Sequence, residues 1–321
     1  MNLEILEVKS IVINYHPRST ARGIAPQKAI YARSMQWTPG GLSDDLEDRR
    51  NESGGGGGFG GFGGRGLGIG GIIIVGLLSL IFRQNFFTLF SGDAGTPVTQ
   101  SAPRQSTPQE ETQVRFMSFV LDDAQRNWDE LLPREAGVRY RHAKLVLFRD
   151  AYPSGCGMAQ DATGPFYCPA DEKVYLDLGF FNELKTRFGG SNGEFAQAYV
   201  VAHEIGHHVQ KVLGIEPKVR ALQERRPGQA NRLSVALELQ ADCFAGVWGN
   251  STAQRRLIDS ADVDQALSAA AAVGDDRIQR MSTGRVSPEN FTHGTAAQRT
   301  TWFQRGLNSG RVAACNTFGG S

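Results

Sequence analysis

A glycine-rich segment and the apolar segment that follows it place the strongest constraint on how this 321-residue chain can fold. Between residues 54 and 64, only Phe59 and Phe62 interrupt the glycines. Glycine loses more backbone entropy on folding than any other residue, so residues 35–66 are expected to be a disordered, polar and glycine-rich segment. The folded domain is therefore predicted to follow, at residues 113–321.

The apolar segment, residues 67–82, reads LGIGGIIIVGLLSLIF and carries no charge. At about 1.5 Å per residue it is slightly short for a bilayer core of about 30 Å, and apolar residues up to Phe90 lengthen it. A buried core helix is the alternative, but such a helix would not normally stand between a glycine run and a polar linker. We predict one transmembrane helix at residues 67–90 that anchors the chain to a membrane.

Arginines flank the apolar segment unequally. Arg49, Arg50 and Arg65 precede it, and only Arg83 lies directly after it. The positive-inside rule then predicts a cytoplasmic amino terminus and a carboxy-terminal domain in the periplasm or outside the cell. A cleaved signal peptide is disfavoured because the preceding region is long and no Ala-x-Ala site follows.

The remaining tails carry weaker signals. Residues 1–34 lack periodicity and are expected to be a disordered extension, with Met35 as a possible true start. Residues 91–112 are rich in Pro, Ser, Thr and Gln, which is typical of a flexible linker. The formal net charge of +1 gives no general attraction to nucleic acid, so no nucleic-acid partner is expected.

Periodicity within residues 113–321 predicts an α+β domain, mostly helical with a small β-sheet. Helical spacing begins near Val114 and ends at Pro133, and a polar segment at 216–229 separates two later helices. Strands are expected at 143–148 and 173–178, and helices at 180–188, 198–210, 230–248, 263–281 and 296–306.

One predicted helix carries the pattern His-Glu-x-x-His as His203, Glu204 and His207. Residues four apart share a helical face, so the two imidazoles can reach one metal ion. Glu204 would lie beside that ion, where a carboxylate can take a proton from metal-bound water. This combination is what a zinc hydrolase requires, although the short pattern also arises by chance.

A catalytic zinc site needs a third protein ligand. Glu238 is the best candidate, and Asp242 lies one turn further on the same helix, where it can orient a ligand histidine. This Glu-x-x-x-Asp pattern resembles the way gluzincins, the thermolysin-like zinc peptidases, complete their site. A metzincin pattern is disfavoured because Leu213 stands where its third histidine would be, and Gln210 where its glycine would be.

Two further histidines, His208 and His293, lie near the predicted site or in a conspicuous motif. His208 is offset by about 100° from His207 on the helix, so it is expected at the surface or behind the ligands and not as a ligand. His293, in Phe-Thr-His-Gly, is a candidate catalytic residue that would stabilise an oxyanion or bind substrate. The alternative for His293 is a helix cap or a packing residue.

The four cysteines all follow the apolar segment. Cys156 and Cys168 bracket one compact loop, and Cys243 and Cys315 remain. On the oxidising side of a membrane we expect the disulfides Cys156–Cys168 and Cys243–Cys315. Four buried thiols are the alternative, and no Cys-x-x-Cys spacing suggests a cysteine zinc site.

Taken in order, these motifs resemble the bacterial putative neutral zinc metallopeptidase family from about Met35 onward. The resemblance includes the segment at 46–50, the glycine run and the single anchor. The motifs that carry it are Cys156-Gly157, the segments 164–169 and 174–178, His203-Glu204-Ile205-Gly206-His207-His208, the segment 238–243, and Phe291-Thr292-His293-Gly294.

The resemblance implies a membrane-anchored zinc peptidase with His203, His207 and Glu238 on zinc, Glu204 as general base and a peptide or protein as substrate. By analogy with gluzincins, the strand at 174–178 is expected to be the edge on which an extended peptide adds. Two alternatives stay open: a non-catalytic envelope protein that uses the zinc fold as a scaffold, and a zinc hydrolase of a non-peptide amide.

Overall fold

The computed structural model describes residues 34–52, 106–160 and 164–319. In these residues the fold is α+β and mostly helical, as predicted. The strands are β1 (Leu46–Asp48), β2 (Lys144–Phe148), β3 (Ala151–Ser154), β4 (Gly157–Gln160), β5 (Phe166–Cys168) and β6 (Lys173–Asp177). The helices are α2 (Pro108–Ala136), α3 (Phe180–Thr186), α4 (Glu194–Val212), α5 (Ile215–Arg225), α6 (Ala230–Gln254), α7 (Ser260–Ala272), α8 (Asp275–Thr283) and α9 (Ala296–Ser309), with short 3₁₀ turns at Pro227–Gln229, Pro288–Asn290 and Val312–Cys315.

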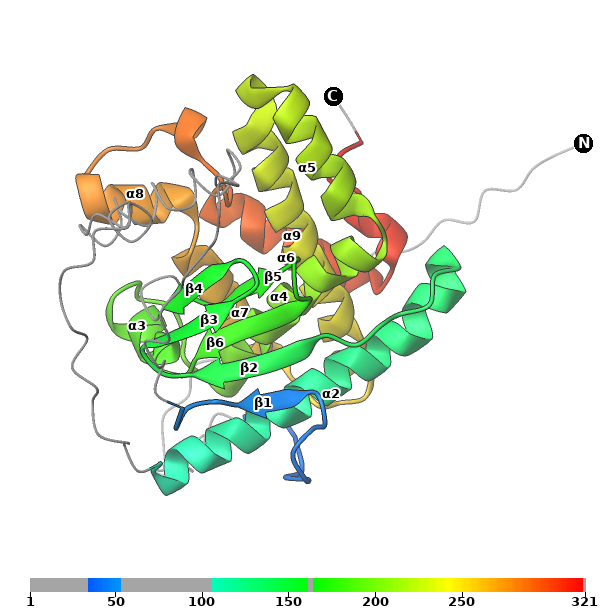
Figure 1. The fold of residues 1–321 in the computed structure, drawn as a ribbon, viewed down its shortest axis with the longest axis vertical. Coiled ribbons are helices and arrows are strands. Elements are labelled where there is room, and N and C mark those ends of the chain that lie inside the picture. The colour runs from blue at the N-terminus through cyan, green and yellow to red at the C-terminus, as the bar shows by residue number, and fades with distance from the viewer. Residues whose placement is uncertain (1–33, 53–105, 161–163, 320–321) are drawn as a thin grey trace, which may run out of the picture. The chain divides into compact units, whose positions relative to one another are not determined.

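The main sheet has the strand order β1-β2-β6-β5 (Figure 1). The first three strands run parallel, with Leu46 opposite Leu145 and Leu145 opposite Val174, and β5 runs antiparallel to β6. The two predicted strands are confirmed as β2 and β6. Because β6 is paired on both sides, the expectation that it forms the exposed edge is wrong, and β5 is the edge strand on that side.

The two faces of the sheet pack against different layers because side chains alternate along a strand. One face joins the helical core, and the other packs on the β3–β4 hairpin. The helix-facing residues are Leu145, Leu147, Val174 and Leu176, and the hairpin-facing residues are Val146, Phe148 and Tyr175. Burial on both faces explains why these strands read as continuous apolar runs.

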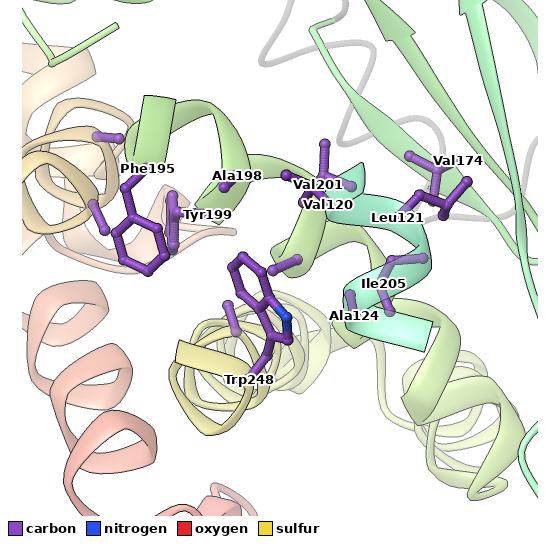
Figure 2. Close-up of a cluster of buried hydrophobic side chains, with 14 of the residues drawn as sticks. Val120, Leu121, Ala124, Val174, Phe195, Ala198, Tyr199, Val201, Ile205 and Trp248 are labelled. Carbon is purple, nitrogen blue, oxygen red and sulfur yellow. The ribbon is translucent and has the colours of Figure 1, made fainter. Parts of the chain in front are cut away.

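Helix α4 lies in the middle of the helical core. Figure 2 shows Phe195, Tyr199 and Ile205 of α4 packed among residues of α2 and Trp248 of α6. Val201 and Ile205 are 1% and 0% exposed, so this side of α4 is fixed by packing. The opposite side of α4 is left to face the cavity described below.

Helices α6 and α9 cross at two glycines. A Cβ at Gly306 would overlap the carbonyl oxygen of Cys243, and a Cβ at Gly246 would overlap that of Phe303. Only glycine allows the two backbones to approach this closely. The crossing joins the carboxy-terminal helix to the helix that carries Glu238.

We expect Gly306→Ala to destabilise the protein by about 1–3 kcal/mol, because the added methyl group must push α9 away from α6. Gly228→Ala is the matched control, since a Cβ there would meet nothing within 4 Å. Urea unfolding of both variants measures the difference. Equal urea midpoints for the two variants would show that the crossing of α6 and α9 tolerates a side chain.

Residues 34–52, which we call the amino-terminal strap, pack on the domain. Met35 is 2% exposed, and the Trp37 ring lies 5.2 Å from that of Phe116 on α2. Arg50 is buried between Asp48 and Glu111, with contacts of 2.7 and 2.9 Å. The expectation that residues 35–66 are all disordered is therefore wrong for 35–52, because strand pairing and these contacts order the strap.

Helix α2 begins earlier and ends later than predicted. The Thr107 hydroxyl accepts a hydrogen bond from the Glu110 amide, and the Glu110 carboxylate accepts one from the Thr107 amide. This is a capping box, with Pro108 in the first turn. The last residues assigned to a linker at 91–112 thus belong to the helix. Pro133 lies inside the last turn, and Gly137 ends the helix in the left-handed conformation.

The strap also bears on the predicted membrane topology. A single crossing at residues 67–90 would place 34–52 and 106–319 on opposite sides of a membrane. The pairing of β1 with β2 contradicts that arrangement, because both strands belong to one sheet. The predicted anchor itself lies outside the described residues, and no helix within them has the length and apolar character to span a bilayer.

Both expected disulfides are confirmed. Cys156 is bonded to Cys168, which ties the β3–β4 hairpin to β5. Cys243 is bonded to Cys315, which ties α6 to the last 3₁₀ turn. Bonds of this kind persist in oxidising compartments.

Candidate metal centre

The cavity-facing side of α4 carries the His-Glu-x-x-His residues. His203 and His207 lie four residues apart on one face, and their ring centroids are 4.9 Å apart. Glu204 is adjacent to His203 and is 7% exposed. The amphipathic character of α4 therefore brings both imidazoles to one side, as the spacing predicted.

Glu238 on α6 completes a cluster of possible metal ligands. Its two carboxylate oxygens lie 3.3 Å from His203 Nε2 and 3.4 Å from His207 Nε2. Within the described residues, the ligand atoms of this set lie within 4.8 Å of one another. Two imidazole nitrogens and one carboxylate are a donor set that zinc takes in catalytic sites, so the residues fit this metal.

The other ring nitrogens of the two histidines are already occupied. His203 Nδ1 lies 2.8 Å from Asp242 Oδ1, and His207 Nδ1 lies 2.9 Å from Gln210 Oε1. A carboxylate or amide oxygen can only accept here, so each Nδ1 donates and each Nε2 keeps its lone pair for a metal. The predicted position of Asp242 is thus confirmed, whereas the contribution of Gln210 was not foreseen.

The close approach of α4 to α6 depends on Gly206, between the two ligand histidines. A Cβ at this position would lie 2.9 Å from the carbonyl oxygen of Ala241 and 3.1 Å from its Cα. A side chain here would push α6 away and carry Glu238 out of reach of the imidazoles. The glycine of His-Glu-Ile-Gly-His therefore has a structural reason that the metal motif alone does not explain.

Asp242 is fully buried and shared among several donors. The Arg299 guanidinium donates to both of its oxygens, at 2.8 and 2.9 Å, and the Tyr199 hydroxyl donates to one of them at 2.5 Å. Arg299 is 3% exposed, so this is a buried ion pair with its hydrogen bonds satisfied. Arg299 thereby holds the carboxylate that orients His203.

The charges of the cluster favour a cation. Burial lowers the pKa of His203, but Asp242 and Glu238 outweigh burial and raise that pKa to about 10. Burial raises the pKa of Glu238, yet His207 and His293 hold it well below its usual value. Metal binding at this site would therefore displace a proton, as is general for histidine ligands.

The cluster opens onto a cavity of about 370 Å³. His203, Glu204, His207 and Glu238 all line it, so the proposed ligands and the neighbouring carboxylate meet in one accessible space. The volume lies within the range of small-ligand sites, about 300–1,000 Å³. An accessible cation with an adjacent carboxylate is the arrangement that metal-assisted hydrolysis requires.

Comparison with known proteins agrees with this geometry. The sequence model of one protein family, described as putative neutral zinc metallopeptidase, matches residues 35–318. The chain belongs to this family. The matched region includes the amino-terminal strap as well as both helices of the metal cluster.

The chain is similar to proteins of two different bacteria. Uncharacterized protein YpfJ of Escherichia coli K12 is 48% identical over 289 residues, which cover 89% of this chain and 100% of the relative. Uncharacterized protein Rv2575 of Mycobacterium tuberculosis H37Rv is 46% identical over 201 residues, covering 60% of this chain and 66% of the relative. No solved structure matches the chain at a significant level.

His293 reaches the cavity of this metallopeptidase family member from the loop before α9. Asp275, which is fully buried, accepts hydrogen bonds from the backbone amides of Thr292, His293 and Gly294 at 2.6–2.9 Å. Its other oxygen lies 3.1 Å from His293 Nδ1, which leaves Nε2 as the nitrogen available to a substrate. Burial lowers the pKa of His293, but Glu238 and Asp275 outweigh it and raise the pKa.

His208 is fully buried, so the surface alternative is wrong. As expected, it is not among the converging ligand residues, and each of its ring nitrogens has a hydrogen-bond partner. Nε2 donates to the Arg141 carbonyl at 2.6 Å, so Nδ1 accepts from the Tyr167 hydroxyl at 2.9 Å. Burial lowers the pKa of His208, in keeping with a neutral ring. The residue fixes Tyr167 on β5, at the edge of the cavity.

Proposed function

We propose that this family member is a zinc-dependent peptidase that hydrolyses peptide bonds in the cavity beside α4. One observation carries the proposal: His203, His207 and Glu238 converge on one point, with Glu204 next to them on the cavity wall.

Each residue of the site would have a distinct role. His203, His207 and Glu238 hold zinc, which when bound would polarise the scissile carbonyl and lower the pKa of a water molecule to about 7. Glu204 accepts the proton of that water and passes it to the leaving amine. Asp242 and Gln210 keep the two imidazoles in the orientation that the site needs.

His293 would act on the substrate carbonyl. Its Nε2–H can donate a hydrogen bond to the oxygen as negative charge develops there, while Asp275 holds the ring from the opposite side. In its protonated form the ring donates from both nitrogens, from Nδ1 to Asp275 and from Nε2 to the substrate. This role is chosen over a purely structural one because the residue lines the cavity.

The substrate would bind as an extended peptide along β5. This short strand is an edge of the sheet, and Phe166 and Tyr167 line the cavity. An edge strand offers unpaired backbone donors and acceptors to a peptide. The disulfide at Cys168 and the His208–Tyr167 hydrogen bond would keep this edge in place.

We place the peptidase in an oxidising compartment, the periplasm or the cell exterior, because all four cysteines are paired. The amino-terminal strap would lie on the same side as the catalytic residues, since β1 pairs with β2 in the sheet of the same domain. Any membrane attachment through the apolar run at 67–82 would have to leave both of its flanks on that side.

The decisive experiment incubates the purified full-length chain with a peptide library, with and without a chelator, and then restores zinc. We expect cleavage that the chelator abolishes and zinc restores. Zinc bound without hydrolysis of any substrate would favour a non-catalytic scaffold. Cleavage of cell-wall fragments but of no linear peptide would favour a non-peptide amide hydrolase. The full chain is used because residues 34–52 supply a strand of the sheet.

A further inference from the structure

The cavity differs in character along α4. One turn before Glu204, Val200 lies on the same face of the helix and lines the cavity. Beyond His207, the lining includes Gln210 and the ion pair of Glu216 with Arg220, whose atoms are 2.6 Å apart. The amino-terminal end of the cavity is therefore apolar, and the carboxy-terminal end is polar.

The apolar end has a buried floor and a partly exposed rim. Leu184 is fully buried, and Phe188 and Ile278 are each 8% exposed. Phe180, Val200 and Val273 are partly exposed and line the same cavity. These six side chains, which we call the apolar end, come from α3 and the turn after it, α4, the end of α7, and α8.

The walls of the apolar end are held together by local close packing. A Cβ at Gly190 would lie 2.8 Å from the Ala272 Cβ and 3.2 Å from Leu184 Cδ1, so only glycine lets α3 and α7 meet here. Glu183 also lines the cavity at this end, and Arg187 lies 3.9 Å from it. The elements that form the apolar end are thus closely packed against one another.

We propose that the apolar end receives a large apolar side chain of the substrate, Phe, Leu, Ile or Met, at a position adjacent to the scissile bond. The inference rests on the proposed peptidase function and names the class of peptide that it cuts. Val200 and Glu204 are one helical turn apart, so a side chain on the rim lies close to the carbonyl that Glu204 serves. Water leaves both apolar surfaces when such a side chain enters, which favours binding.

The polar end of the cavity is expected to accept a wider range of substrate side chains than the apolar end. Glu216 and Arg220 are paired with each other, and Arg220 is exposed to water, so they offer no comparable gain to an apolar side chain. Substrate residues on that side are expected to vary more freely. Specificity should therefore depend on one side of the scissile bond.

The test profiles cleavage of a peptide library by the zinc-loaded full-length chain and by two variants that fill the apolar end, Val200→Trp and Val273→Trp. Wild type is expected to favour Leu or Phe over Ala at one flanking position by roughly 10- to 200-fold in kcat/KM. Each variant should reduce this ratio at least about 10-fold while still cleaving peptides with Ala there. Arg220→Ala, at the polar end, is the matched control and should keep the wild-type ratio.

The outcomes separate this inference from the proposed function. Cleavage by wild type without an apolar preference would overturn the inference and leave the peptidase function standing. An unchanged ratio in a folded, zinc-containing tryptophan variant would do the same. Failure of the zinc-loaded wild type to cleave any peptide would overturn both. Two filling variants are used so that one remains informative if the other does not fold.

Discussion

Replacing Glu204 by glutamine is expected to abolish peptide hydrolysis while leaving zinc in place. Glutamine keeps the size of the side chain but cannot accept the proton of the attacking water. Glu204 is not among the three side chains whose ligand atoms converge, so the metal should remain. General-base catalysis is worth about 10²–10⁴-fold, which sets the expected loss in kcat.

Two measurements on the same preparation check this expectation: zinc content by atomic absorption, and kcat with the best library peptide. Glu224→Gln, an exposed residue of α5 that does not line the main cavity, is the matched control. Wild-type rates in the Glu204 variant would exclude it as the base. A variant that lost both zinc and activity would instead assign Glu204 a role in holding the metal.

Replacing Glu238 by alanine is expected to remove the metal itself. Two imidazoles then remain, and the negative charge that opposes them is lost. Loss of an outer partner of a ligand typically costs 10- to 100-fold in metal affinity, so loss of a direct ligand should cost more than about 100-fold. Peptidase activity is expected to fall together with the zinc content, whereas the Glu204 variant should lose activity and keep its zinc.

A zinc titration followed by thermal unfolding measures the loss of zinc affinity in the Glu238 variant. Wild type should gain stability as zinc is added, because a ligand that binds only the folded state raises the free energy of unfolding. The Glu238 variant should gain nothing in the same zinc range, and Asp242→Asn should show a smaller loss of affinity of about 10- to 100-fold. Full zinc loading of Glu238→Ala would remove this residue from the ligand set.

The residues of the metal centre that could be predicted form two short patterns, each on one helix. His203, Glu204 and His207 lie on α4, and Glu238 and Asp242 lie one turn apart on α6, so spacing places each set on one helical face. The resemblance to the gluzincin pattern, and not the spacing, predicted that the two sets meet. Arg299 and Asp275 reach the centre from distant parts of the chain. No local periodicity marks a buried arginine or aspartate as the partner of a particular histidine.

The strands of the sheet were also predictable only where the sequence has a local apolar pattern. Strands β2 and β6 are continuous apolar runs, and both were predicted. Strand β1 is Leu46-Glu47-Asp48, which has no apolar pattern of its own. It is held by pairing with β2 and by contacts such as Glu47 with Lys173 at 2.7 Å. The polar segment predicted at 216–229 is mostly helix α5, since Pro217 lies in the first turn, where proline is tolerated.

The place of β1 in the sheet has a consequence for the order in which the molecule assembles. Leu46 and its partner Leu145 are far apart in the sequence, so this pairing is expected to form late in folding. Until it does, β2 exposes a row of backbone groups that another nascent chain could pair with. Docking of the strap covers this edge of β2 and so removes a surface on which two copies of the chain could aggregate.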